Sequence, residues 1–322
     1  MKHRIIIAFA ATAGLLLAPL SAVRAMTVSP VLFEFDVAKG TSKQETIKIW
    51  NDTEQVQTYS LAVQNFVATG EDGAQEYLDE KEPTGLASWV IVDRPTVTLQ
   101  PGESADFPFA VNVPADAEPG GHYATVFFAV GSETAETGVG IASRTGVLLL
   151  VNVPGEIRED ARVESFRLMG GGTLSRLPAT FELRIRNLGS THFRPRGTLV
   201  IRNLLGSVVT RVAANPKSSA VLPQSVRRVY SVWANTMEVP SGGFWTEMKN
   251  EWRNFAFGRY TATVDMTYGS KNATIPTQTA TFWVFPWRLT LIAALAVVAM
   301  FLLLKGYNTL IVRAALKRSG KK

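Results

Sequence analysis

Residues 289–304 read LTLIAALAVVAMFLLL, and the rest of the chain is arranged around this run without charges. As a helix the run rises about 24 Å, slightly less than a hydrocarbon core, and amphipathic residues at both ends extend its reach. We therefore predict a transmembrane helix over residues 286–310; the alternative is a helix buried in a globular core. The flanking residues expected to contact the membrane at the headgroup level are Trp287, Arg288, Lys305 and Tyr307.

The charges beside this helix predict its orientation. From Lys305 to the C-terminus the chain carries six Lys and Arg residues and no acid, which is typical of a cytoplasmic segment. We therefore expect residues 311–322 to form a basic cytoplasmic tail. The chain before the helix would then lie outside the plasma membrane, as a single-pass protein with its N-terminus outside.

The first 25 residues predict export. Basic residues precede the apolar run 5–18, and the small residue Ala25 ends the segment as a signal peptidase requires. This pattern indicates a signal peptide over residues 1–25, with an uncleaved N-terminal anchor as the alternative. The chain has no cysteine, so disulfides, thiolate metal sites and cysteine nucleophiles are excluded.

The charge is unevenly distributed along the chain. The formal net charge is +6, but the excess lies in the signal segment and the tail, so it does not indicate a nucleic-acid partner. Residues 26–154 carry 6 bases and 18 acids, whereas residues 155–288 carry 18 bases and 9 acids. This division predicts an acidic domain over 26–154 and a basic domain over 155–285. Either the basic domain faces anionic lipid headgroups, or the asymmetry reflects surface drift or mutual attraction of the domains.

Both domains show the pattern of β-sandwiches. Residues 46–50 alternate between polar and apolar side chains before a turn at Asn51, and Phe181, Leu183 and Ile185 alternate with charged residues. Strand patterns recur about every ten residues and are separated by Pro and Gly. The expected fold class is all-β: two tandem immunoglobulin-like β-sandwiches followed by a single C-terminal transmembrane helix.

Arginines accompany one of these strands. Arg184 and Arg186 alternate with the apolar side chains, which predicts positive charge on one face of a sheet in the second domain. Such a face can attract phosphate-rich glycopolymer or lipid, or it can serve solubility alone.

Residues 242–257 interrupt the strand pattern of the second domain and predict a helical insertion. The residues on its apolar face are Phe244, Trp245, Met248, Trp252 and Phe255. In one interpretation this helix packs across an open end of the sandwich. In the other, the five side chains contact the outer surface of the bilayer, as those of interfacial helices do.

The sequence contains no motif of a known catalytic site. It lacks a GxSxG elbow, an HExxH helix and a phosphate-binding glycine loop. The two histidines of the expected mature chain, His122 and His192, fall in different domains, and the acids between Glu71 and Glu82 do not alternate as calcium ligands do. We expect a protein that is not an enzyme, with no catalytic, metal or cofactor-binding residues and no cofactor.

Two stretches carry a family resemblance. Residues 29–66, SPVLFEFDVAKGTSKQETIKIWNDTEQVQTYSLAVQNF, and residues 88–130, SWVIVDRPTVTLQPGESADFPFAVNVPADAEPGGHYATVFFAV, resemble the N-terminal, peptidoglycan-binding-type immunoglobulin-like domain of bacterial WxL-interacting proteins. Their opening is also similar to the sandwich of periplasmic pilus chaperones. The first resemblance implies an exported protein with two sandwich domains, a membrane helix and a basic tail. It further implies a first domain that binds peptidoglycan and a second that binds a partner protein or host surface.

We therefore expect a membrane-anchored bacterial cell-envelope protein that presents two immunoglobulin-like domains to bind cell wall or a surface partner protein. The alternative is a chaperone-like assembly factor of the envelope or a surface structure, acting by β-strand addition. The expected partners are the lipid bilayer, through the C-terminal helix, and peptidoglycan or a secreted or surface protein. Because peptidoglycan is partly anionic, the acidic domain would bind it through aromatic contacts and hydrogen bonds.

Overall fold

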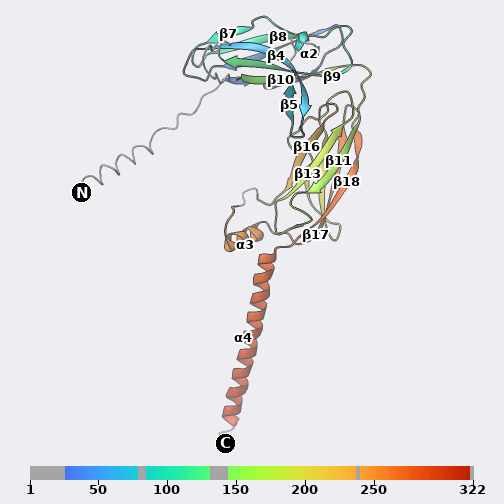
Figure 1. The fold of residues 1–322 in the computed structure, drawn as a ribbon. Coiled ribbons are helices and arrows are strands. Elements are labelled where there is room, and N and C mark those ends of the chain that lie inside the picture. Colours follow the sequence, from blue (N-terminus) through green and yellow to red (C-terminus); the bar gives the residue numbers. More distant parts are fainter. Residues whose placement is uncertain (1–25, 79–84, 131–143, 237–239, 320–322) are drawn as a thin grey trace, which may run out of the picture. The chain divides into compact units, whose positions relative to one another are not determined.

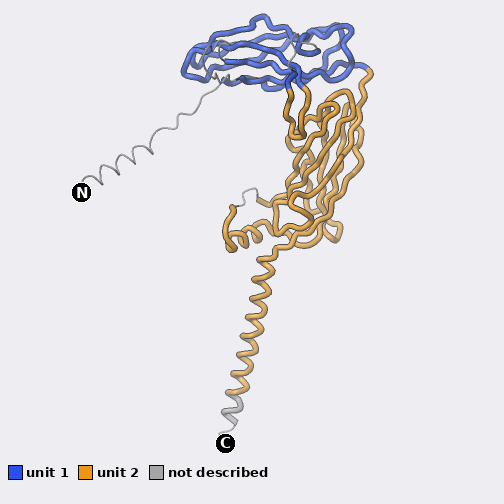
Figure 2. The backbone as a smooth tube through the Cα atoms, in the orientation of Figure 1, with its two compact units in different colours: residues 1–66, 77–155 blue, residues 67–76, 156–322 orange. Residues whose placement is uncertain are grey.

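The computed structural model describes residues 26–78, 85–130, 144–236 and 240–319 (Figure 1). The predicted signal segment, residues 1–25, lies outside them. The chain forms two compact units, coloured separately in Figure 2. Unit 1 comprises Met1–Phe66 and Tyr77–Gly155, and unit 2 comprises Val67–Glu76 and Glu156–Lys322.

Unit 1 is a sandwich of two sheets. The first has the order β1 (Thr27–Ser29), β3 (Ser42–Trp50), β8 (Ser104–Asn112) and β6 (Val90–Val92). The second has the order β2 (Leu32–Asp36), β10 (Arg144–Val153), β9 (Gly120–Val130), β4 (Gln57–Thr69) and β5 (Ala74–Tyr77), with β7 (Thr96–Leu99) also paired to β4. The end of β4 and most of β5 fall within Val67–Glu76, which is assigned to unit 2. A single short helix, α2 (Gly85–Trp89), occurs in the described part of this unit. Ile47, Tyr59 and Phe128 are fully buried between the sheets.

Unit 2 repeats this architecture. Its first sheet has the order β11 (Ala161–Leu168), β13 (Ala179–Asn187) and β16 (Val226–Trp233). Its second has the order β12 (Thr173–Leu174), β18 (Ala273–Val284), β17 (Gly258–Tyr268), β14 (Arg196–Asn203) and β15 (Val208–Ala213). The predicted inward residues Phe181, Leu183 and Ile185 are at most 2% exposed, because alternate side chains of a strand point to one face.

Two helices complete unit 2. Helix α3 (Phe244–Arg253) lies within the segment 242–257, and α4 (Trp287–Ser319) follows β18 after two residues. Residues 287–313 of α4 are long and apolar enough to cross a membrane, and no part of their most apolar stretch is buried. The helix continues through most of the segment expected as a tail, since residues 311–319 contain neither Pro nor Gly. The fold class is confirmed: two immunoglobulin-like sandwiches precede one apolar C-terminal helix.

Candidate functional sites

Helix α3 exposes its aromatic face and buries its polar one. Trp245 and Trp252 are 67% and 73% exposed, whereas Asn250 and Glu251 are at most 3% exposed. Phe255 was predicted on the same helical face, but α3 ends at Arg253, so Phe255 follows the helix and is 52% exposed. Phe244 is also exposed and packs edge-on against Trp245, with ring centroids 5.5 Å apart. An exposed aromatic face on a helix anchored by polar side chains is the reverse of ordinary globular packing.

Glu251 joins α3 to the first turn of α4. Its carboxylate accepts hydrogen bonds from the backbone N–H groups of Arg288 and Leu289, at 3.1 and 3.0 Å, and from Nη1 of Arg288 at 2.9 Å. The first N–H groups of a helix have no partner within the helix, and the positive end of the helix dipole favours an anion there. Glu251 is therefore a cap for α4 that comes from another helix.

Further polar contacts hold α3 in this orientation. Nδ2 of Asn250 donates to the carbonyl of Pro240 at 2.7 Å, and Oδ1 of Asn254 accepts from the N–H of Thr236 at 3.1 Å. Arg176 pairs with Glu247 at 2.9 Å and thereby lowers the pKa of that carboxyl. The polar side of α3 is thus occupied by specific partners, so the aromatic side is the one left exposed.

The other expected membrane-contacting residues differ in their surroundings. Trp287 and Tyr307 are 44% and 66% exposed, and Lys305 is also exposed, whereas Met248 is half-buried. Arg288, which is also among the residues expected at the headgroup level, has a side chain that is only 20% exposed. It turns toward Glu251 because a carboxylate with no exposure of its own requires a cation.

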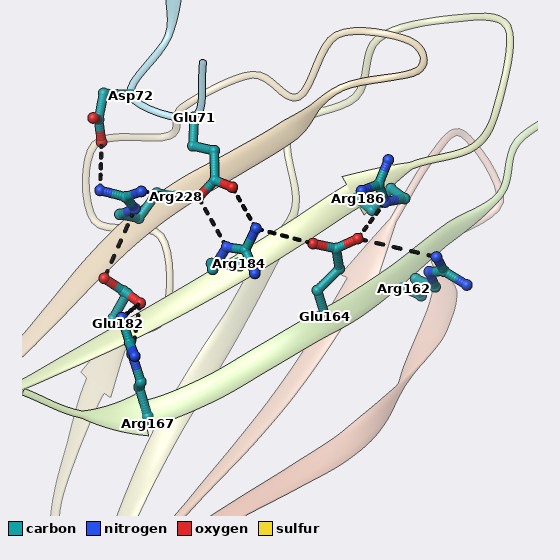
Figure 3. Close-up of polar contacts among 9 residues, drawn as sticks. All are labelled: Glu71, Asp72, Arg162, Glu164, Arg167, Glu182, Arg184, Arg186 and Arg228. Carbon is teal, nitrogen blue, oxygen red and sulfur yellow. Dashed lines mark hydrogen bonds and ion pairs between the residues drawn. The ribbon is translucent and has the colours of Figure 1, made fainter.

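A network of ion pairs covers the three-stranded sheet of unit 2 (Figure 3). Arg184 and Arg228 lie directly opposite each other on β13 and β16, where like charges repel. Glu71, from the turn between β4 and β5, accepts from Nε of Arg184 at 2.8 Å and from Nη2 of Arg228 at 3.0 Å. Glu164 pairs with Arg184 at 3.3 Å and also with Arg186.

This network changes the interpretation of the predicted basic face. Arg184 and Arg186 pair with the carboxylates of Glu71 and Glu164, so their charges are partly offset within the protein. Glu71 also explains why Val67–Glu76 belongs to unit 2, which the contiguous boundaries 26–154 did not anticipate. At the same turn, Gly73 has a positive φ of 86°, which favours glycine, and a Cβ there would displace the Arg227 guanidinium from its present position.

The turn at Glu71 is expected to loosen in acid. Hydrogen bonds from Arg184 lower the pKa of Glu71 from 4.5 to about 2. A lowered pKa means that the interaction stabilises the fold above about pH 4.5 and is lost as the pH falls toward 2. Protection factors from hydrogen exchange of residues 67–76, which are corrected for the pH dependence of intrinsic exchange, should therefore fall across this window. They should fall less in Glu71→Gln, in which the turn is already weakened at neutral pH. Equal pH dependence in both proteins would contradict this assignment.

Strand β10 of unit 1 is paired along its full length on one side but only along part of its length on the other. Its ten residues all pair with β9, but β2 pairs with it only over Leu148–Asn152. The N–H of Leu148 donates to the carbonyl of Val31, and since backbone groups alternate, the N–H groups of Gly146 and Arg144 point to the same side. No described strand meets them. Pro30, which has no N–H, precedes β2, and the chain before it pairs into the other sheet.

The two histidines of the expected mature chain belong to different units. His122 contacts the Trp89 ring at a centroid distance of 4.5 Å, and its Nε2 lies 2.9 Å from the carbonyl of Glu118. His192 belongs to unit 2. Among the described residues, no group of three or more His, Asp or Glu side chains could hold a metal ion.

The chain is a protein with two tandem immunoglobulin-like β-sandwiches. Its sequence matches no protein-family model and no curated protein, so the resemblance to WxL-interacting proteins receives no support. Among solved structures it is similar to a chain of a chaperone–tip adhesin complex of CFA/I fimbriae biogenesis, with 11% identity, 80% of this chain and 98% of that chain covered, and a TM-score of 0.39. It is also similar to the class 5 fimbriae chaperone CfaA, with 11% identity, 80% and 99% coverage and a TM-score of 0.38.

A third similar structure is the E. coli chaperone DraB, with 13% identity, 80% of this chain and 98% of that chain covered, and a TM-score of 0.34.

Proposed function

We propose that this protein is a single-pass envelope protein that binds an extended segment of a partner protein by β-strand addition. In this proposal α4 crosses the plasma membrane with its basic end in the cytoplasm, and both units lie outside. The aromatic face of α3 lies in the outer interface of the same bilayer. Partner binding occurs on unit 1, by the β-strand addition that the chaperone-like alternative from the sequence also involves.

The observation that supports partner binding is the unpaired edge of β10 over Arg144–Val147, which we call the open half of β10. An unpaired strand edge presents backbone N–H and C=O groups to any extended chain. Beyond Leu148, the β10 edge has no described partner over Arg144–Val147, and Val31 beside it is 62% exposed. A partner segment placed here would continue the line of β2 and cover Val31.

Two variants of Arg144 test this edge. Arg144→Pro removes the N–H that points to the open side, whereas Arg144→Ala removes the same guanidinium and keeps the N–H. We expect a photoreactive residue at Val31 of the full chain, in intact bacteria, to crosslink a secreted or surface polypeptide. The Arg144→Pro variant should lower the yield about fivefold relative to Arg144→Ala, since a hydrogen bond is worth about 1 kcal/mol.

The control site for crosslinking is Lys271, which is exposed on unit 2. Equal yields from Arg144→Pro and Arg144→Ala would show that the edge is not used. Absence of a polypeptide adduct, together with retention of the protein on insoluble peptidoglycan at moderate salt, would favour cell-wall binding instead.

A further inference from the structure

The turn between β14 and β15 exposes two leucines at its tip. Leu204 and Leu205 are 70% and 87% exposed. The turn is nevertheless well built, because Oδ1 of Asn203 accepts from the N–H groups of Leu205 and Ser207, each at 3.0 Å. Gly206 supplies the positive φ of 80° that completes it. The leucines are therefore held outward by a closed turn whose backbone groups have partners.

The strand register places this turn at the end of unit 2 from which α4 leaves. Asn203, the last residue of β14, pairs with Tyr260 near the start of β17. Gly258, the first residue of β17, pairs with Val284, the last residue of β18. Phe285 and then α4 follow β18 directly. The turn therefore projects toward the side of α4, two strands away from β18 in the sheet.

Other exposed apolar side chains lie at this end of unit 2. Phe257 and Phe285 are 56% and 45% exposed, and their ring centroids are 6.0 Å apart. Arg202 and Arg259 are also exposed, and neither makes an ion pair with another described residue. Apolar side chains beside unpaired arginines match the acyl boundary and the anionic headgroups of a bilayer.

We propose that the β14–β15 turn is a second bilayer contact of unit 2. Leu204 and Leu205 insert among the outer-leaflet acyl chains, and Arg202 binds an anionic headgroup. The occupant is a bilayer because α4, which starts at this same end, would bring the membrane surface to the level of Phe285. Unit 2 then contacts the bilayer through α3 and this turn as well as through α4. This inference rests on the proposed anchoring by α4.

Spin labels can measure the depth of this turn, because the chain has no cysteine of its own. The full-length variants Leu205→Cys, Lys271→Cys and Val298→Cys would each be labelled and placed in nanodiscs that contain anionic phospholipid. Lys271 lies in the turn at the opposite end of β17, and Val298 is an exposed residue of α4. Frequent collisions with oxygen indicate that a label lies in the hydrocarbon of the bilayer, and frequent collisions with a water-soluble nickel chelate indicate that it lies in water.

We expect the label at Leu205 to be at least threefold more accessible to oxygen relative to nickel than the label at Lys271. Equal ratios at these two positions, with Val298 in hydrocarbon, would overturn the inference and leave the anchoring intact. A label at Val298 that collides mainly with nickel would overturn the anchoring itself. A Leu205 label protected from both reagents would indicate a protein contact and would also overturn the inference.

Discussion

Replacing Glu251 with alanine is expected to destabilise unit 2 by about 3 kcal/mol. The substitution leaves the Arg288 guanidinium, which is 20% exposed, without its anion, and it removes the acceptor for two N–H groups at the start of α4. Loss of one partner from a buried pair costs about 3–5 kcal/mol, and we take the lower end because Arg288 keeps some exposure. A loss of this size would lower the melting temperature of unit 2 by roughly 10 °C.

Calorimetry of the full chain in nanodiscs would measure this effect, with Glu156→Ala as a control because Glu156 is exposed. Hydrogen exchange of Arg288 and Leu289 should accelerate in Glu251→Ala and remain unchanged in the control. The double variant Glu251→Ala, Arg288→Ala should be more stable than Glu251→Ala alone, since it removes the unpaired charge. Equal melting temperatures for Glu251→Ala and Glu156→Ala would show that the Glu251 cap does not stabilise unit 2.

Replacing Trp245 and Trp252 with serine is expected to weaken membrane binding at least tenfold. Both side chains are more than 65% exposed, so the substitutions remove apolar surface that contacts little else in the protein. Full burial of a large apolar side chain is worth about 1.5–3 kcal/mol, and tenfold corresponds to about 1.4 kcal/mol. Vesicle binding of a soluble fragment, residues 26–290, would measure the difference.

The fragment must include Arg288, because ending it earlier would leave Glu251 buried without its cation. A matched control is Val56→Ser, Ile91→Ser, which removes two side chains of unit 1 that are 51% and 52% exposed. Circular dichroism should show that all three fragments are folded. Equal vesicle binding by the tryptophan variant and the wild-type fragment would refute the contact of α3 with the bilayer.

These results would describe a protein held at the membrane by one end of unit 2. The polar side of α3 is joined to α4 through Glu251, while its aromatic side is exposed. The open half of β10 lies in unit 1. In our proposal, membrane attachment and partner binding therefore depend on different residues, so each can be tested by substitutions that spare the other.

Local patterns in the amino-acid sequence were sufficient to predict the sandwich class and the apolar helix. The alternation around Phe181, Leu183 and Ile185 and the uncharged run 289–304 depend on residues close together in the chain. The same patterns could not assign the faces of α3. Its aromatic residues and its polar residues Glu247, Asn250, Glu251 and Asn254 both recur at helical spacing, so periodicity predicted a helix but not which side would be buried.

The remaining features depended on groups that are distant in the chain. Glu251 meets Arg288, Glu71 meets Arg184, and Leu205 lies at the same end as Phe285 only through the register of three strands. Charge pairing, helix capping and strand pairing act through space, and one sequence does not state which distant groups will meet. The spacing of hydrophobic residues along the chain was therefore enough to determine the sheets and the apolar helix. Which polar groups are buried and which apolar groups remain exposed depends on the tertiary structure.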